Sequence, residues 1–378
     1  MSTHLVDASR ISRSSVRRSP ALAGIGSALP EHRWSQRDLS LLQADLWSLH
    51  GSELDRWTRI VERSGIEHRA IVGDPTELPT LSTAARMERF EHHAPPLARA
   101  AARRALANAG CRAEEVTDLV IVTCTGFSAP GLAGELIGVR GIGLPETVRP
   151  LQLGFMGCFG GIAGLRAAGS IASADRQAVV LVVCVELCSL HLRADRDPQN
   201  LVASALFADG AAAAVVRGTS AADIASPIPL GRGRSLTLPE GRAEMTWRIT
   251  DHGFAMTLSR EVPVLVRRRL AGFLESASPS PLAVLPHPGG PGILEAVESS
   301  IASSRLSERL DPRGLAAARG VLRDCGNLSS ATILLVIERA LADGVALPAE
   351  AVAFGPGLAI DSIGLGAPDD AAPRTIDA

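Results

Sequence analysis

Two similar successions of helix and strand patterns constrain the fold of this chain more than any other feature of its sequence. In the first copy, a helix, an apolar strand, a turn and a closing strand lie at 97–109, 119–124, 154–158 and 178–185. In the second copy, a helix, a strand, a turn, a helix and a strand lie at 266–274, 282–287, 324–327, 329–342 and 349–354. The alternation predicts an α/β fold, and the repetition predicts two halves related by a pseudo-twofold axis.

The repeat also predicts which turns meet in space. Cys158 and Asn327 occupy equivalent helix starts, and His287 ends the strand that corresponds to the strand ending at Cys124. A pseudo-twofold arrangement would bring these turns to a shared central cleft. The first helix is expected to start at Pro95-Pro96, because proline fits the first turn of a helix.

The composition narrows the chemistry that is available. All 38 basic residues are arginine, and the chain contains neither lysine nor tyrosine. This excludes lysine Schiff-base chemistry and P-loop phosphate binding, and it leaves Cys, His, Asp, Glu, Ser and Asn as reactive groups. Because the formal net charge is −2, we expect no nucleic-acid partner.

Cysteine spacing and apolar runs indicate the cellular setting. The six cysteines form no Cys-x-x-Cys pair, so we predict neither a disulfide framework nor a metal site, and we expect a cytoplasmic protein. No apolar run approaches the ~18 residues of a membrane span, and we expect no membrane partner. Residues 1–21 are expected to be a disordered N-terminal tail, and residues 366–378 a C-terminal tail.

Cys158 is the strongest candidate nucleophile. Gly157, Gly160 and Gly161 surround it and permit a tight strand-to-helix turn with close backbone packing. At a helix start, the dipole and the free N–H groups are expected to lower the pKa of the thiol toward the thiolate. The alternative is an inert core cysteine, which is the usual role of a cysteine among apolar residues.

His287 and Asn327 are candidates for the groups that assist such a nucleophile. His287 lies in the rigid sequence Pro286-His-Pro-Gly-Gly-Pro-Gly292, which suits a positioned imidazole or, alternatively, a histidine satisfied within its turn. Asn327 follows Gly326, and its alternative role is a helix N-cap. An imidazole N–H and an amide together form a two-donor oxyanion site, which a thioester enolate requires.

Three arginines share one face of a predicted helix. Arg56, Arg59 and Arg63 are spaced i, i+3 and i+7. They form either a solvated face or a clamp for phosphates, because the guanidinium group matches phosphate oxygens with two parallel N–H donors.

Six short motifs follow one another along the chain. They are Thr123-Cys-Thr-Gly-Phe-Ser-Ala-Pro-Gly131, Gly154-Phe-Met-Gly-Cys158, Leu206-Phe-Ala-Asp-Gly210, His287-Pro-Gly-Gly-Pro291, Gly326-Asn-Leu-Ser-Ser330 and Phe354-Gly-Pro-Gly357. In this order they resemble the motifs of type III polyketide synthases, the chalcone-synthase-like branch of the thiolase superfamily. The resemblance implies a thiolase-like layered α-β-α-β-α fold, with an N-terminal half over 22–225 and a C-terminal half over 226–365.

The resemblance assigns roles to the candidate residues. It implies that Cys158 accepts an acyl group, that His287 and Asn327 activate it and hold the thioester oxygen, and that Phe207 is a gatekeeper before the reaction cavity. Other residues implied to line the cavity are Met256, Trp247, Cys124, Cys188, His191 and Ser329. Residues implied to bind CoA are Arg56, Arg59, Arg63 and Gly292.

The reaction implied by the resemblance is an iterative condensation. An acyl-CoA starter loads Cys158, malonyl-CoA extends it with loss of CO2, and the product cyclises without a cofactor other than the CoA thioesters themselves. A homodimer is implied, with the segment around Ala129 approaching the partner's cavity. Plant members have an aromatic gatekeeper at the position of Met256 and often a glycine at that of Trp247, so we expect a reshaped pocket.

The subgroup and the product follow less directly. Glu186-Leu-Cys-Ser-Leu-His191 and Trp247-Arg-Ile-Thr-Asp-His-Gly253 resemble bacterial alkylpyrone and alkylresorcinol synthases, which implies a pyrone- or resorcinol-type product. One alternative is a single-condensation ketosynthase of the same superfamily. Another is a papain-like thiol hydrolase, which has the same order of Cys, His and Asn but a Cys-Gly-Ser-Cys-Trp signature absent here. A third, a non-catalytic scaffold, conflicts with the intact Cys158, His287 and Asn327.

Overall fold

The structure is a computed structural model that describes residues 19–193, 195–218, 227–277 and 280–367. Most of the two expected tails, residues 1–18 and 368–378, lie outside the described residues. All of the candidate site residues lie within them.

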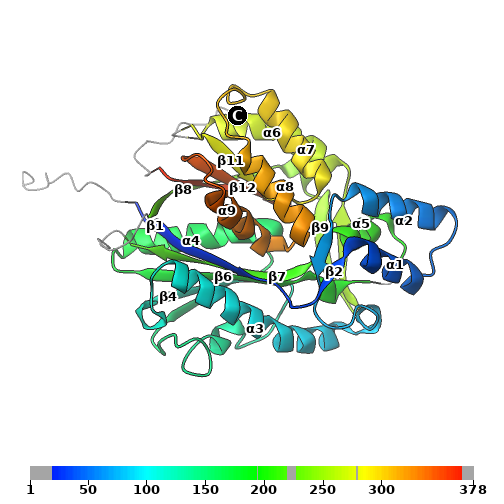
Figure 1. The fold of residues 1–378 in the computed structure, drawn as a ribbon, viewed down its shortest axis with the longest axis horizontal. Helices are drawn as coiled ribbons and strands as arrows, with labels where there is room; N and C mark the ends of the chain where they lie inside the picture. The colour runs from blue at the N-terminus through cyan, green and yellow to red at the C-terminus, as the bar shows by residue number, and fades with distance from the viewer. Residues whose placement is uncertain (1–18, 194, 219–226, 278–279, 368–378) are drawn as a thin grey trace, which may run out of the picture.

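Two groups of strands join into one mixed sheet of nine strands within the described residues, in the order β11-β12-β13-β8-β1-β7-β6-β4-β5 (Figure 1). The first group contains β1 (Ala21–Ala28), β4 (Asp118–Val122), β5 (Arg149–Leu153), β6 (Val179–Leu187) and β7 (Asp209–Arg217). The second contains β8 (Ile228–Thr237), β11 (Ala283–Pro286), β12 (Ala349–Gly355) and β13 (Ala359–Leu365). The groups meet where Ala21 and Leu22 of β1 pair with Pro229 and Ile228 of β8.

The two groups repeat one topology, as the sequence predicts. β4 and β6 are parallel and β6 and β7 antiparallel, while β11 and β12 are parallel and β12 and β13 antiparallel. Parallel neighbours need a crossover connection. The helices α4 (Gly160–Ala174) and α9 (Thr332–Ala342) lie in these two crossovers and are the repeated helices.

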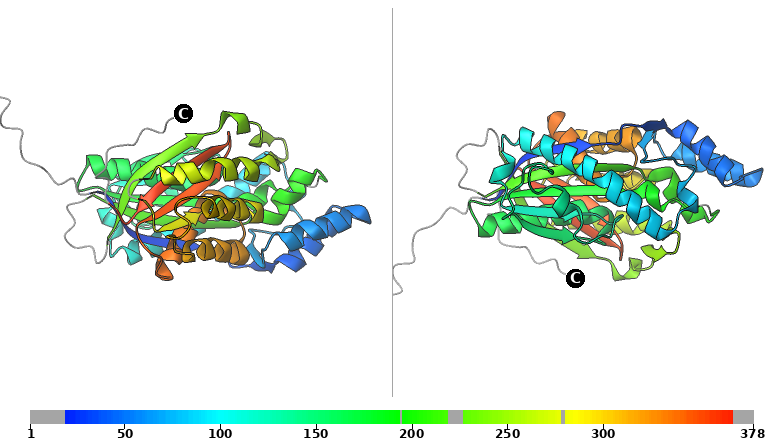
Figure 2. Two further views of the ribbon diagram at one scale, coloured as in Figure 1. Left: turned by 90° about the horizontal axis from the view of Figure 1, so that it is seen from above. Right: turned by 90° about the horizontal axis from the view of Figure 1, so that it is seen from below.

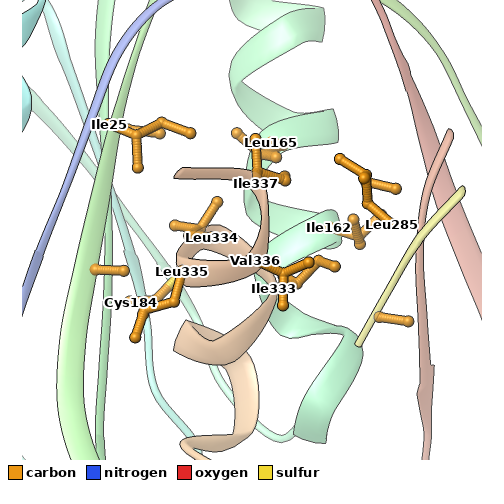
Figure 3. Packing of buried hydrophobic residues seen from close by; sticks show 14 of the residues in the cluster. Ile25, Ile162, Leu165, Cys184, Leu285, Ile333, Leu334, Leu335, Val336 and Ile337 are labelled. Carbon is orange, nitrogen blue, oxygen red and sulfur yellow. The ribbon is translucent and has the colours of Figure 1, made fainter. Parts of the chain in front are cut away.

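Helices form three layers around the two groups of strands (Figure 2). The central layer buries apolar side chains of α4 and α9, including Ile162, Leu165, Ile333 and Ile337, between Ile25 of β1 and Leu285 of β11 (Figure 3). α8 (Arg313–Cys325) packs in the same layer. α3 (Thr83–Asn108) covers the outer face of the first group, and α6 (Glu261–Glu275) and α7 (Pro291–Ala302) cover that of the second. This is the layered α-β-α-β-α fold that was expected.

Strand β4 shows why the sequence pattern is continuous rather than alternating. Val120 and Val122 face the central layer, whereas Leu119 and Ile121 face α3, and all four are buried. A strand that is covered on both faces needs apolar residues at every position. The apolar run over 119–122 therefore follows from its place between two helical layers.

Helix α3 begins earlier than the sequence predicts. Its N-cap is Ser82, whose Oγ accepts a hydrogen bond from the Ala85 N–H at 3.2 Å, and Pro95 and Pro96 lie inside the helix. An internal proline costs about 3 kcal/mol because it removes a backbone hydrogen bond. Packing of Ala98 and its buried neighbours against the sheet offsets that cost. The expected start at the two prolines is therefore wrong.

The remaining elements gather mainly at one end of the molecule, around α5 (Figure 1). They are α1 (Gln36–Leu46), α2 (Ser52–Arg63), α5 (Pro198–Leu206), the hairpin of β9 (Met245–Thr250) and β10 (Gly253–Leu258), and the pair β2 (Arg33–Ser35) and β3 (His68–Ala70). Further 3₁₀ turns lie elsewhere, at Leu78–Thr80, Ala113–Glu115, Leu132–Glu135 and Pro239–Gly241. Among the described residues, no helix has both the length and the apolar character needed to cross a membrane.

Candidate active site

One cavity of about 350 Å³ collects the candidate residues from both halves of the chain. Cys158, His287 and Asn327 all line it, although they come from three separate turns. The cavity also contains the other predicted cavity residues, namely Phe207, Met256, Trp247, Cys124, Cys188, His191 and Ser329, together with Gly292. The shared cleft predicted from the repeat therefore exists.

The nucleophile turn depends on glycine. Cys158 lies in the short 3₁₀ helix η5 (Gly157–Phe159), directly before α4. Gly157 has a φ of 64°, and a Cβ on it would lie 2.5 Å from Cδ of Pro356. A Cβ on Gly161 would lie 2.4 Å from the carbonyl oxygen of Ser330. These glycines let the start of α4 approach the corresponding turn of the second half, as the sequence predicts.

The protonation state of Cys158 differs from the expectation. Burial raises the pKa of the Cys158 thiol to about 12, and hydrogen bonds with Ser329 and Asn327 lower it only in part. The expectation that the helix start alone favours the thiolate is wrong, because removing the sulfur from water outweighs those contacts. A thiol in this state is neutral, so a nucleophilic role for Cys158 would require a base.

His287 has the properties of such a base. Its backbone N–H donates to the carbonyl of Val352 at 2.7 Å, at the end of β11. Both ring nitrogens are buried and have no hydrogen-bond partner among the described residues. Burial lowers the pKa of His287 to about 3, so the ring is neutral. One nitrogen can therefore take a proton while the other donates to a substrate oxygen.

Asn327 lies in a turn directly before a helix, and hydrogen bonds hold its side-chain amide. Its Oδ1 accepts hydrogen bonds from the Ser329 N–H at 2.8 Å and from Oγ1 of Thr332 at 3.3 Å, in the turn that leads into η8 (Ser329–Ala331) and α9, whereas the N-cap of η8 is Leu328. This contact fixes the amide, whose Nδ2 also lies 3.4 Å from the Gly289 carbonyl oxygen. These contacts orient the amide N–H group, which is the candidate oxyanion donor.

Phe207 is fixed to Asn327 through the backbone. The Asn327 N–H donates to the Leu206 carbonyl and the Ala208 N–H donates to the Asn327 carbonyl, both at 2.9 Å. Arg69, a residue that the sequence did not single out, donates from Nη1 to the Phe207 carbonyl at 2.9 Å. Burial lowers the pKa of Arg69 to about 9. The candidate gatekeeper and oxyanion residue are therefore held in one rigid unit.

An aromatic stack forms one wall of the cavity. The rings of Trp247 and Phe254 have centroids 4.7 Å apart, and those of Phe254 and His191 have centroids 3.5 Å apart. Met256 pairs directly with Trp247 across the β9–β10 hairpin. The tryptophan therefore supplies aromatic surface beside the methionine, and the expected reshaping of the pocket stays a prediction. The contribution of Phe254 was not foreseen.

A second hollow of about 760 Å³ adjoins the cavity. It is lined by Arg56, Arg59 and Arg63 of α2, as the shared helix face predicts. The two cavities share four lining residues, namely Val202, Leu258, Ser259 and Arg260. Arg260 adds a fourth positive charge that the sequence analysis missed. Gly292 lines the reaction cavity and not the arginine hollow.

Glu186 is a buried acid behind the site that the sequence analysis also missed. Its carboxylate accepts hydrogen bonds from the Cys124 N–H at 3.0 Å, from Oγ1 of Thr125 at 2.8 Å and from Oγ of Ser330. It thereby joins the two halves beside the nucleophile turn. Burial raises the pKa of Glu186 to about 7. A single acid in the apolar strand β6 was the signal that could have identified it.

Glu186→Gln is expected to flatten the pH dependence of stability. In the folded chain the carboxyl keeps its proton up to a pH of about 7, whereas the unfolded carboxyl releases it near 4.5, so stability falls as pH rises between those values. The difference corresponds to about 3 kcal/mol. Urea unfolding of both proteins between pH 4.5 and 7.5 measures it, and parallel curves would contradict the shifted pKa.

Comparison with known proteins agrees with this geometry. The profile of the chalcone and stilbene synthases, N-terminal domain, matches residues 9–220, and the profile of their C-terminal domain matches residues 233–367. The 1,3,6,8-tetrahydroxynaphthalene synthase of Streptomyces peucetius subsp. caesius is 32% identical over 335 residues, which are 85% of either chain. The probable polyketide synthase 1 of Dictyostelium discoideum is 29% identical over 89% of this chain, which spans 11% of that protein.

Solved structures give the same assignment. The C-terminal type III polyketide synthase domain of Steely1 from Dictyostelium has a TM-score of 0.85 at 27% identity, covering 92% of this chain and 99% of that one. PKS-I of the brown alga Ectocarpus siliculosus has a TM-score of 0.81 at 26% identity, covering 94% and 100%. These matches exclude the papain-like alternative. The chain belongs to the chalcone and stilbene synthase family, the type III polyketide synthases.

Proposed function

We propose that Cys158 carries the growing acyl chain and that the product is a pyrone- or resorcinol-type polyketide. The catalytic part of the proposal rests on one observation: Cys158, His287 and Asn327 line a single cavity. The product class rests on the resemblance of the 186–191 and 247–253 motifs to alkylpyrone and alkylresorcinol synthases. The adjoining hollow of arginines provides a site for the phosphates of CoA thioesters, which are the only substrates proposed.

The first step loads the starter. The Sγ–H proton of Cys158 passes to an imidazole nitrogen of His287 as the sulfur attacks the thioester carbonyl of an acyl-CoA. The oxygen becomes negative and accepts hydrogen bonds from His287 and from Nδ2 of Asn327. The carbon–sulfur bond to CoA then breaks, and the CoA sulfur leaves with a proton. The neutral resting state of His287 suits both transfers.

The second step extends the chain. Malonyl-CoA loses CO2, and the electron pair of the broken carbon–carbon bond forms an enolate whose oxygen is held by His287 and Asn327. The enolate carbon attacks the acyl thioester on Cys158, a carbon–carbon bond forms, and the Cys158 sulfur is released. The apolar ring of Phe207 favours decarboxylation by excluding water from the carboxylate. The extended acyl group is now a CoA thioester, and it returns to Cys158 with release of CoA as in the first step. Repetition gives a chain of alternating carbonyl and methylene groups that cyclises.

Product analysis tests the proposal directly. We expect malonyl-CoA with a panel of short- and long-chain acyl-CoA starters to give ring products with two or more added two-carbon units. Mass spectrometry of the extracts measures the number of units. Products with a single unit would support the single-condensation ketosynthase instead.

Charge removal at Arg56, Arg59 and Arg63 is expected to raise the KM for CoA substrates more than it lowers kcat. These exposed arginines act through attraction to the phosphates, which is equal in the ground and transition states. Added salt should therefore narrow the difference from wild type. The matched control removes Arg267, Arg268 and Arg269, three exposed arginines of α6. Equal KM values in the two triple variants would mean that the α2 arginines form a solvated face and do not bind CoA.

We also propose a homodimer that forms across strand β5. This strand ends the sheet in the described part of the chain, and most of its residues are exposed. Leu151 is 41% exposed, and Phe155, two residues after the strand, is 62% exposed. Ala129, in the segment that the family resemblance places near the partner's cavity, is also exposed. An uncovered edge with apolar side chains is a surface for a second copy. Leu151→Glu should then lower the dimer fraction in sedimentation equilibrium.

The cytoplasmic location of the protein stays a prediction.

A further inference from the structure

His191 is a buried imidazole of the cavity wall to which the reaction above gives no role. It lies in η6 (Cys188–His191), directly after β6, and it is 8% exposed. Its ring stacks on Phe254 with an interplanar angle of 8°. The buried Arg86 donates from Nη1 to the carbonyls of Leu190 and Leu192, on either side of His191. Both the ring and the backbone that carries it are therefore fixed.

The hydrogen bond of this ring determines its tautomer. Nε2 lies 2.8 Å from the carbonyl oxygen of Thr125. A carbonyl oxygen only accepts, so Nε2 carries the proton and donates. Thr125 is itself fixed, since its Oγ1 accepts from the Leu187 N–H at 3.0 Å and donates to Glu186. The neutral ring therefore presents a lone pair on Nδ1.

Nδ1 of His191 has no hydrogen-bond partner among the described residues, and it is buried. Leaving a buried acceptor unpaired costs about 1–3 kcal/mol, and such atoms in native structures call for an explanation. His191 lines the cavity, and a ligand hydroxyl that reached Nδ1 there would remove that cost. The extended intermediate offers one, because two carbonyls flanking a methylene group enolise, and an enol hydroxyl donates where a ketone cannot.

We propose that Nδ1 of His191 accepts a hydrogen bond from an enol hydroxyl of the extended intermediate and thereby determines which carbons meet when the ring closes. This inference rests on the condensation reaction proposed above. His191 is a specificity-determining residue for cyclisation and has no part in loading or decarboxylation.

The same surroundings argue against His191 as the base that starts ring closure. Burial lowers the pKa of His191 to about 3, the charge of Arg86 lowers it further, and the bond to Thr125 raises it only in part. Protonation would place a second buried cation beside Arg86. The ring therefore accepts a hydrogen bond and does not take the proton.

Three substitutions of His191 test the roles of its two ring nitrogens separately. His191→Gln can place an amide N–H near the position of Nε2 but has no acceptor at that of Nδ1. His191→Asn can place its amide oxygen near the position of Nδ1, and His191→Phe keeps the stacking on Phe254 without either polar atom. Mass spectrometry measures the amount of each ring product per CoA released. CO2 release measures decarboxylation, and thermal unfolding measures the stability of each variant.

We expect the ratio of the main ring product to CoA released to fall about tenfold in His191→Phe and in His191→Gln. A change of that size is expected when the ring-closing conformer loses one hydrogen bond. His191→Asn should recover most of that loss. Equal product ratios in the Asn and Phe variants, or losses that follow the thermal stability of each variant, would overturn the role of Nδ1. Absence of CO2 release by the wild type would instead overturn the proposed function.

Discussion

Cys158→Ala is expected to abolish acyl-enzyme formation and chain extension while malonyl-CoA decarboxylation stays measurable. Extension needs the sulfur, because the acyl group is bound to it when the enolate attacks. Decarboxylation needs only the two enolate donors, and His287 and Asn327 remain in the variant. Peptide mass spectrometry after incubation with starter acyl-CoA measures the first activity, and release of labelled CO2 from malonyl-CoA measures the second.

The matched control for this variant is Cys325→Ala. Cys325 is half-buried like Cys158, but it does not line the reaction cavity. Its replacement should leave acylation and extension at wild-type rates. An acyl group found on Cys124 or Cys188, the other two cysteines of the cavity, would refute the assignment of the nucleophile.

Asn327→Asp is expected to lower malonyl-CoA decarboxylation by about 100–1,000-fold, because that is the usual cost of removing one oxyanion donor. The aspartate keeps an oxygen that accepts from the Ser329 N–H and from Thr332. It lacks the Nδ2 donor and places a negative charge beside the enolate. His287→Ala should show a loss of similar size.

The comparison with Asn327→Ala distinguishes the two roles of this residue. The alanine variant loses the hydrogen bonds from the Ser329 N–H and from Thr332, whereas the aspartate variant keeps both but buries a carboxylate, so thermal unfolding of each variant is measured beside its activity. Both should lose decarboxylation. If the aspartate variant releases CO2 at the wild-type rate, Asn327 only holds its turn, and another donor must hold the enolate.

Much of the fold could be predicted because its signals are local. Strand β4 is an apolar run and helix α9 has a periodic apolar pattern, so each can be recognised from its own residues. The repetition of such patterns along the chain implies the two related groups of strands. Glycines around Cys158 and prolines around His287 mark turns that need an unusual or rigid backbone. These constraints act within a few residues, and a sequence therefore displays them.

The start of α3 could not be predicted from the same kind of signal. Local rules place Pro95 and Pro96 at a helix terminus, but the alanine face around Ala98 packs on the sheet and sustains the helix through them. Long-range packing of this kind outweighs a local preference of a few kcal/mol. Only the folded chain shows which of the two is larger.

By itself, then, the sequence determined the repeated α/β units and the three turns that carry Cys158, His287 and Asn327, because each depends on residues that are close together along the chain, whereas the layered arrangement was expected only from the family resemblance. The tertiary structure decided the state of those groups. Burial raises the pKa of the Cys158 thiol and lowers that of the His287 imidazole, and desolvation depends on every segment that surrounds a side chain. The acid of Glu186 and the free nitrogen of His191 became visible for the same reason: their neighbours come from distant parts of the chain.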